Sequence, residues 1–218
     1  MNQLVTTFDG SHTIFVPELN EHYHSIHGAV QESMIVFIRN GFEYCQANPV
    51  NILEIGFGTG LNALLTAVKC INTNRKTIYT SIEKNPLTEN LINKLNHWSF
   101  AGEKGKQIFD SIHSSEWGFF KKITENFNLK KLKCDLLRDD IEGKFDLIYF
   151  DAFGPDKQPE MWTWNVFMKL AEVTASKGIL VTYSAKGEVK RILKSCGFKI
   201  SLLPGPPGKR EMIRAVKQ

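Results

Sequence analysis

The stretch Asn51-Ile-Leu-Glu-Ile-Gly-Phe-Gly-Thr-Gly-Leu-Asn62 decides the fold of this chain. It begins with a short apolar run, Ile52 to Ile55, of the kind that forms a strand buried on both faces. Three alternate glycines follow, and then an apolar run from Leu61 to Val68 that favours a helix. The pattern predicts a strand, a tight turn and a helix whose first N–H groups point at a ligand. Glycines in the turn let that ligand lie against the main chain.

The spacing of the glycines excludes two common phosphate-binding motifs. The dinucleotide fingerprint G-x-G-x-x-G needs its third glycine where this chain has Leu61. A P-loop ends in Gly-Lys-Ser/Thr, whereas Gly60 is followed by Leu and Asn. What remains is the pattern E-x-G-x-G-x-G, which begins at Glu54 and contains Gly56 and Gly58. This pattern is compatible with a turn that binds a ligand other than a phosphate, and also with a glycine-rich turn that binds no ligand.

Composition indicates one globular domain with a sizeable core. The chain has 218 residues, 42% hydrophobic and 23% charged, which are ordinary values for an α/β domain. Early acidic residues such as Asp9 exclude a secretory signal, and no apolar run approaches the roughly 18 residues of a membrane span. Cys45, Cys70, Cys134 and Cys196 are widely separated, which favours free thiols in a reducing compartment. We therefore expect a cytoplasmic protein without a membrane segment.

The first 50 residues are expected to form an extension packed on the core, which would run from residue 51 to 218. Two β-rich runs, Leu4 to Phe8 and Thr13 to Val16, flank Asp9-Gly10 and predict a hairpin. Val30 to Gln46 carries an apolar stripe with helical spacing that ends near Pro49.

Six further strands are expected in the core, in addition to the one before the glycine turn. They are Thr77 to Ile82, Lys131 to Cys134, Phe145 to Phe150, Gly178 to Ser184, Phe198 to Leu203 and Met212 to Val216. Residues 87–129 are expected to be helical with an insertion rich in Trp, Phe and Lys, and residues 162–175 to form another helix. A tight turn joins the last two strands, so one of the seven strands runs antiparallel to the others.

Acidic residues follow three of these strands. Glu83 ends the second strand, where nucleotide-binding α/β folds place a carboxylate that accepts both ribose hydroxyls. Asp135-Leu136 follows the third strand, where an adenine-contacting acid is expected, and Asp151 follows the fourth. Because ligands of open α/β sheets bind at the carboxyl ends of the strands, we expect these residues to share one site.

Two other clusters are less informative. His22, His24 and His27 lie close together, but no acidic or cysteine partner has metal-ligand spacing, so no metal site is expected. The net charge is +4, with a pI near 8.8, which is compatible with a polyanionic partner. Five lysines between Lys121 and Lys133 favour a solvated surface, whereas the basic tail includes Lys209-Arg210 in a Pro/Gly-framed turn.

The glycine turn resembles the first motif of class I S-adenosylmethionine (SAM) methyltransferases. The chain as a whole resembles one family among them, the MnmC-type methyltransferases of tRNA wobble uridine. The matching segments span nearly the whole chain: Ser11 to Thr13, Glu21 to Ser25 with Gly28-Ala29 and Glu32, Gly56 to Asn62, Glu83 to Pro86, Asp151 to Pro155, Pro159 to Trp162, and Gly208 to Met212. The last three segments are more specific than the glycine turn.

The resemblance implies a Rossmann-like class I methyltransferase fold, α/β with a seven-stranded and mostly parallel sheet, that uses S-adenosyl-L-methionine. It implies that cofactor contacts come from Glu32, Glu54, Gly56, Gly58, Gly60, Leu61, Asn62, Glu83, Lys84, Asp135, Leu136, Asp151 and Ala152. It implies that substrate contacts come from Tyr23, Phe153, Trp162, Lys209 and Arg210. Bifunctional members also carry a flavin-dependent oxidase domain, which is not expected in a chain ending at Gln218.

The implied reaction converts 5-aminomethyl uridine of tRNA, with or without a 2-thio group, to its 5-methylaminomethyl form. Asp151 is the candidate catalytic residue, either taking a proton from the amine or only orienting it. A separate oxidase, or an enzyme acting earlier on the same uridine, is a candidate partner besides tRNA. Two alternatives remain open: transfer to a small amine such as a polyamine, as in aminopropyl-transfer enzymes, and a SAM-binding module without activity.

Overall fold

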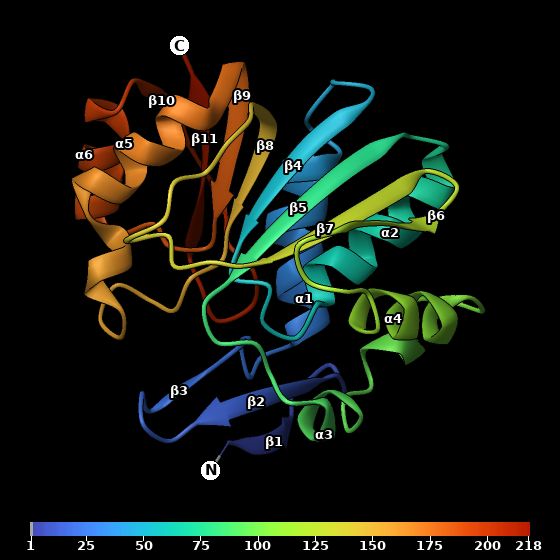
Figure 1. Cartoon of the computed structure of the whole chain (residues 1–218). Helices are drawn as coiled ribbons and strands as arrows, with labels where there is room; N and C mark the ends of the chain where they lie inside the picture. Colours follow the sequence, from blue (N-terminus) through green and yellow to red (C-terminus); the bar gives the residue numbers. More distant parts are fainter. Residues whose placement is uncertain (1) are drawn as a thin grey trace.

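An eight-stranded sheet forms the centre of the molecule (Figure 1). The computed structural model describes residues 2–218. The strand order is β10-β11-β9-β8-β4-β5-β7-β6. The strands are β4 (Val50–Ile55), β5 (Thr77–Glu83), β6 (Phe120–Thr124), β7 (Phe127–Lys133), β8 (Phe145–Phe150), β9 (Thr174–Thr182), β10 (Phe198–Pro204) and β11 (Glu211–Lys217). Strands β9, β8, β4, β5 and β7 pair in parallel, while β11 is antiparallel to both of its neighbours.

Helices cover both faces of this sheet, so the central strands are apolar on both sides. Neighbouring residues of β4 belong to different core clusters: Ile52 packs on one face and Leu53 on the other. The first face is covered by α2 (Leu61–Thr73), α4 (Gly105–His113) and the π-helix η1 (Met34–Phe42). The second is covered by α5 (Trp164–Val173) and α6 (Gly187–Ser195). This arrangement confirms the predicted mostly parallel α/β sheet.

The seven expected strands are present, and an eighth is added at one edge. The expectation that residues 87–129 are helical is wrong over part of that range. The segment contains the short helices α3 (Glu89–Ile92) and η2 (His97–Phe100) and then α4, but it continues into β6. Strand β6 pairs antiparallel with β7, which is longer than predicted and parallel to β5. Without β6, the edge of β7 that faces away from β5 would have unpaired backbone groups. Pairing of β6 with this edge outweighs the local preference for a helix.

The lysines of this region do not form one basic face. Lys131 is only 2% exposed, donates to the carbonyl of His113 at 3.0 Å, and lies over the rings of Phe57 and Trp117. Burial lowers the pKa of the Lys131 ammonium group to about 8. Lys122 is paired with Glu125 at 2.7 Å. These lysines, although close in the sequence, therefore lie in different surroundings: Lys131 in the interior and Lys122 in a surface ion pair.

The N-terminal residues form a second, smaller sheet beyond the carboxyl ends of the central strands (Figure 1). Strands β1 (Gln3–Thr6) and β2 (His12–Val16) form the predicted antiparallel hairpin, and β3 (Glu21–His22) adds a third strand. Helix α1 (Ala29–Ser33) leads into η1, whose Val36, Phe37 and Phe42 belong to the main core. The division at residue 50 into an extension and a core remains our proposal.

Two remaining sequence expectations concern membranes and cysteines. No helix among residues 2–218 is long and apolar enough to cross a membrane. The thiols of Cys45, Cys70 and Cys196 are buried and free, and that of Cys134 is free and partly exposed.

Histidines from three segments gather beneath the glycine turn. The rings of His24 and His97 lie 5.9 Å apart, and both His97 and His113 contact Phe109. The Nε2 atom of His24 is 2.7 Å from the hydroxyl of Thr59, whereas neither ring nitrogen of the fully buried His97 has a partner among the described residues. Burial lowers the pKa of His24 and of His113 to about 4, and that of His97 well below its usual value. These histidines are neutral in the folded protein at neutral pH.

This cluster should make stability fall with decreasing pH. Unfolded histidines bind a proton near pH 6.5, but the folded ones do so only near pH 4 or below, so the unfolded state binds more protons between these values. The contribution of these histidines to the free energy of unfolding should be level above that window and decrease as the pH falls through it. His97→Leu removes one such group and should flatten the slope by about 1.4 kcal/mol per pH unit.

Urea unfolding between pH 4.5 and 7.5 measures this slope. Ile112→Val is the control, because Ile112 lies in the core cluster that contains Phe109, the ring that His97 contacts. This change should lower stability by about 0.5–1.5 kcal/mol at every pH and leave the slope unchanged. An unchanged slope in His97→Leu would contradict the assignment.

Candidate active site

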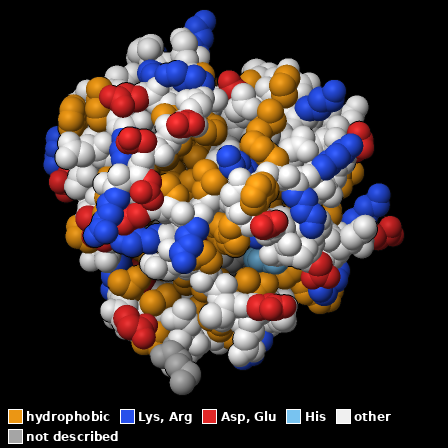
Figure 2. Space-filling view, in the orientation of Figure 1, with side chains coloured by type: hydrophobic (Ala, Val, Ile, Leu, Met, Phe, Trp, Pro, Cys, Tyr) orange, Lys and Arg blue, Asp and Glu red, His pale blue; other side chains and the backbone are white. Residues whose placement is uncertain are grey.

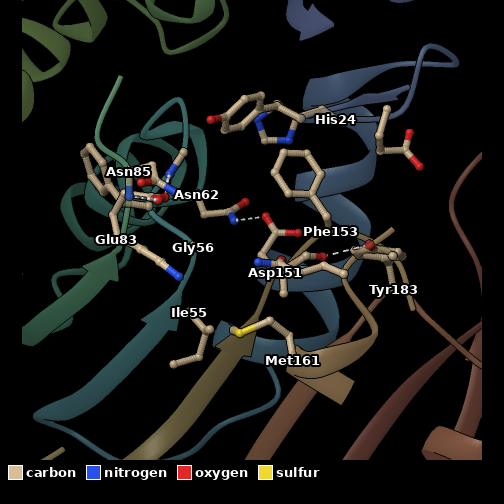
Figure 3. A pocket seen from close by; sticks show the side chains of 18 of the residues that line it. His24, Ile55, Gly56, Asn62, Glu83, Asn85, Asp151, Phe153, Met161 and Tyr183 are labelled. Atoms are coloured by element: carbon tan, nitrogen blue, oxygen red, sulfur yellow. Dashed lines mark hydrogen bonds between the residues drawn. The ribbon is translucent and has the colours of Figure 1, made fainter. Parts of the chain in front are cut away.

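A cavity of about 410 Å³ lies at the carboxyl ends of β4, β5 and β8. Its walls come from these strand ends, from the segment around β3 and α1, and from the turn between β10 and β11 (Figure 3). The predicted site residues that line it are Tyr23, Glu32, Gly56, Gly58, Leu61, Asn62, Glu83, Lys84, Asp135, Leu136, Asp151, Ala152, Phe153 and Lys209. Figure 2 shows hydrophobic side chains gathered near the middle of this face, with charged side chains around them.

The glycine turn forms the floor of the cavity by bringing the backbone close to its neighbours. Gly56 has a φ of 89°, and a Cβ there would lie 2.7 Å from the carbonyl oxygen of Asp151. Gly58 has a φ of 50°, and a Cβ there would lie 3.0 Å from the Tyr23 ring. Both positions therefore require glycine. The turn leaves a backbone cradle of the kind that a flexible, polar ligand chain can occupy.

Glu83 is fixed by the turn that it faces. One carboxylate oxygen accepts from the backbone N–H of Gly58 at 3.1 Å and the other from that of Asn85 at 2.8 Å. Lys84 forms a 3.0 Å salt bridge with Asp135 at the same end of the sheet. Leu136 is buried beside them. The predicted nucleoside-binding residues thus lie together, with the Glu83 carboxylate held in one orientation.

Asp151 faces the cavity from the end of β8. Its Oδ2 atom accepts from the side-chain amide of Asn62 at 2.8 Å (Figure 3). Burial, with a further contribution from the negative charge of Glu32, raises the pKa of Asp151 to about 7; the Asn62 hydrogen bond and the Lys209 charge oppose that rise. A carboxyl group with this pKa can both accept and release a proton near neutral pH.

Two aromatic side chains form the wall beside Asp151. The rings of Tyr23 and Phe153 lie 5.1 Å apart at 71°. The Tyr23 ring also contacts the glycine turn. Together the two rings make an apolar surface beside the cradle and the acidic group.

Four predicted site residues do not line the cavity. Glu54 is fully buried behind the turn, accepts from the hydroxyl of Ser81 at 2.6 Å, and has its pKa raised by burial to about 8. Gly60 begins α2 with a φ of 73° and packs against His113. The buried Trp162 donates to the carbonyl of Phe153 at 2.7 Å, and Arg210 is exposed. Their roles as direct contacts remain predictions.

Sequence reasoning missed Tyr183 and His24, which also line the cavity. Tyr183 follows β9, and its hydroxyl donates to the carbonyl of Ala152 at 2.8 Å. The rule that ligands gather at the carboxyl ends of parallel strands, applied to β9, would have identified it. His24 lies in the segment Glu21 to Ser25 that resembles the family, but its place in the wall depends on how the small sheet packs.

Comparison with known proteins assigns this fold and cavity to a class of enzyme. Residues 105–218 match a family described as S-adenosyl-L-methionine-dependent methyltransferase, and the chain belongs to that family. It is therefore a SAM-dependent methyltransferase.

Particular relatives are more specific. The chain is 34% identical over 171 residues to the tRNA 5-methylaminomethyl-2-thiouridine biosynthesis bifunctional protein MnmC of Campylobacter hominis, covering 77% of this chain and 26% of that protein. It is 30% identical over 211 residues to the MnmC protein of Pseudomonas syringae pv. syringae, covering 90% and 32%. The chain thus spans between a quarter and a third of these relatives. The crystal structure of MnmC2 from Aquifex aeolicus superimposes with a TM-score of 0.80 and 27% identity, covering 100% of this chain and 70% of that one.

The residues of the cavity fit SAM. A Cβ at Gly56 or Gly58 would collide with the walls of the cradle, so only glycine leaves the main chain there open to a ligand. A zwitterionic methionine tail supplies donors and acceptors for main-chain groups of this kind. The Glu83 carboxylate is an acceptor at the position expected for ribose hydroxyls.

Glu83→Ala should weaken SAM binding by about 1–3 kcal/mol, because it removes the acceptor for the ribose and leaves the N–H of Gly58 unpaired. Titration calorimetry with SAM measures the effect. Glu125→Ala, which changes an exposed glutamate on the β6–β7 turn, is the matched control. Equal affinities for wild type and Glu83→Ala would show that the carboxylate does not contact the ribose.

Proposed function

We propose that this chain methylates the exocyclic amine of 5-aminomethyl uridine, or of its 2-thio form, at the wobble position of tRNA. The observation that carries the proposal is that Asp151, the glycine cradle and the Tyr23–Phe153 wall line one cavity. Similarity to MnmC proteins, whose names refer to 5-methylaminomethyl-2-thiouridine biosynthesis, supports the substrate class.

When bound, SAM supplies a methyl group on a cationic sulfur. Glu83 would hold its ribose, Asp135 and Leu136 would lie at the adenine, and the cradle of Gly56 and Gly58 would hold the methionine tail. Asn62 lines the same part of the cavity, and its side-chain amide holds the Asp151 carboxylate. These residues set the position of the methyl group relative to Asp151.

The substrate amine arrives mostly as an ammonium ion and must lose a proton before it can accept a methyl group. Asp151 in its carboxylate form takes that proton, so the amine becomes neutral and regains its lone pair. When the nitrogen gains the methyl group it becomes a secondary ammonium ion, and the carbon–sulfur bond that breaks would leave a neutral thioether. Asp151 then releases its proton to solvent and regains its carboxylate form. Alignment of the amine by Asp151 and the aromatic wall supplies part of the roughly 7–11 kcal/mol available from orientation.

The aromatic wall favours a planar base over a polyamine. RNA-binding proteins hold single-stranded bases by stacking them on aromatic side chains, and Tyr23 and Phe153 present such surfaces. An aliphatic polyamine has no planar face to stack, and its ammonium groups would gain only cation–π contacts from the two rings. We place the reaction in the cytoplasm, after a separate oxidase or another enzyme acting earlier on the same uridine has exposed the amine by removing a carboxymethyl group.

The β10–β11 turn carries two cationic residues, Lys209 and Arg210, which lie in different surroundings. Lys209 lines the cavity, whereas Arg210 is exposed beside it. A phosphodiester next to the target nucleotide would reach Arg210 first. We assign Arg210 to the RNA backbone.

Incubation with methyl-labelled SAM and either tRNA carrying 5-aminomethyl uridine or spermidine tests the function. We expect label in the 5-methylaminomethyl nucleoside, identified by mass after digestion, and none in spermidine. Asp151→Asn should lower the single-turnover rate by about 10² or more with SAM affinity kept, and should abolish the acid limb that is expected near pH 7 for wild type.

Asp110→Asn, on the exposed face of α4, is the control and should behave as wild type. Label in spermidine alone would overturn the tRNA proposal. A full rate in Asp151→Asn would leave the substrate assignment intact and remove the carboxylate from the proton transfer.

Arg210→Ala should weaken tRNA binding and reduce the dependence of log affinity on log salt by about one unit, because one phosphate contact is lost. SAM affinity should not change. Filter binding across a salt series measures both effects, with Arg191→Ala on α6 as the control. Lines that coincide for Arg210→Ala and wild type would remove Arg210 from the RNA contact.

A further inference from the structure

The cavity contains a second buried carboxylate. Glu32, on α1, is 5% exposed, and its Oε2 atom accepts from the backbone N–H of Ser25 at 2.8 Å. The ammonium group of Lys209 forms an ion pair with its other oxygen. These partners are 177 residues apart in the sequence. The ion pair therefore joins the N-terminal wall of the cavity to the β10–β11 turn.

Lys209 is also tied to the strand end that carries Asp151. Its ammonium nitrogen lies 3.7 Å from the centroid of the Tyr183 ring, whose hydroxyl donates to the carbonyl of Ala152. Residue 152 directly follows Asp151. The Glu32–Lys209 pair is thus linked, through Tyr183 and the carbonyl of Ala152, to the strand end that carries Asp151.

The backbone is shaped to bring the two partners together. Gly208, next to Lys209, has a φ of 83°, and a Cβ there would lie 2.2 Å from the ring of His27. A Cβ at Gly28, which has a φ of 142°, would meet the side chain of Asp9. A side chain at Gly208 would push the turn away from the segment before α1, and one at Gly28 would displace the start of α1 from Asp9. Since apolar residues of similar volume could hold the two segments as well, stability alone does not explain a buried ion pair here.

Side chains from every element packed around Asp151 can influence its charge. They are Glu32 on α1, Glu54 on β4, Asn62 on α2, Tyr79 on β5, Tyr183 after β9 and Lys209 on the turn, with His24 facing the Glu32–Lys209 pair. Burial keeps Glu54, the two tyrosines and His24 neutral at pH 7, because it raises the pKa of the first three and lowers that of His24. Of this set, Glu32 and Lys209 are the groups left to act on Asp151 by full charge.

We propose that Glu32 and Lys209 form a positioning pair for Asp151: Lys209 neutralises the second carboxylate of the cavity, so that Asp151 alone takes the proton of the incoming ammonium group. The role of the proton acceptor rests on the function proposed above. The electrostatic coupling among the three side chains does not. Without Lys209 two carboxylates would face one another, and one of them would hold a proton. Without Glu32 the positive charge of Lys209 would keep Asp151 ionised and repel the ammonium group.

Removing either charge should move the acid limb of the pH–rate profile, in opposite directions. The negative charge of Glu32 raises the pKa of Asp151 and the positive charge of Lys209 lowers it. Lys209→Met should therefore shift the limb to higher pH, and Glu32→Gln to lower pH, each by about one pH unit. The double variant loses both charges and should return close to wild type. Lys209→Arg keeps the charge and should also stay close to wild type.

Two measurements decide the proposal. The first is the single-turnover rate of the full chain with SAM and 5-aminomethyl uridine tRNA from pH 5.5 to 9. The second is a carbon NMR titration of protein labelled at its aspartate carboxyl groups, with the Asp151 signal identified by its absence in Asp151→Asn. Because the titration needs no substrate, it reports the coupling even if tRNA is not the substrate.

Lys69→Met is the matched control. The side chain of Lys69 is 31% exposed and paired with Glu43, much as that of Lys209 is 32% exposed and paired with Glu32, but Lys69 does not line this cavity. Its loss should leave the Asp151 titration unchanged.

Shifts of the Asp151 titration in the same direction for Glu32→Gln and Lys209→Met, or no shift in either, would overturn the proposal. A purely structural pair would lower the melting temperature and leave the titration in place. If Lys209→Met does not fold, Glu32→Gln and the double variant still decide, since the proposal requires a downward shift in the first and its reversal in the second.

Discussion

The close approach of the glycine turn to the end of β8 is the constraint on which the rest of the site depends. The backbone N–H of Asp151 donates to the carbonyl of Ile55 at 3.0 Å, and Gly56 follows with no room for a side chain. A single methyl group at Gly56 would force these strand ends apart. The same contact orients Asp151 toward Asn62 at the start of α2. Cofactor cradle and acidic group are therefore fixed by one piece of backbone geometry.

Burial of ionisable groups is a second constraint on the structure. Four side chains lie in surroundings that disfavour an isolated charge, and the structure compensates each in a different way: Glu54, Asp151, Glu32 and Lys131. Glu54 is kept in its neutral form by burial, and Lys131 is compensated by a carbonyl and two aromatic rings. Glu32 is paired. Asp151, whose pKa burial raises to about 7, has an amide partner and an open side toward the cavity, which suits a group that exchanges protons.

The N-terminal segment connects stability to function. Helix η1 is part of the main core, whereas the residues before it supply Tyr23, His24 and Glu32 to the cavity wall. His24 packs on His97 and contacts Thr59 of the glycine turn. The segment is thus held by core packing on one side and by the turn on the other. A cavity closed by a separate sheet can adapt in sequence to a particular substrate while the cofactor side stays constant.

The sequence by itself determined the parallel sheet, the glycine turn and the acidic residues at the strand ends. Short apolar runs predict strands locally, and the carboxyl ends of parallel strands meet at one edge, so Glu83 and Asp151 could be placed together without coordinates. Only the tertiary structure decided that Lys209 pairs with Glu32, that Lys131 is buried and that β6 joins the sheet. A lysine looks the same in the sequence whether it faces water, a ring or a carboxylate. Its partner is chosen by the packing of segments far apart in the chain, and no local pattern encodes that packing.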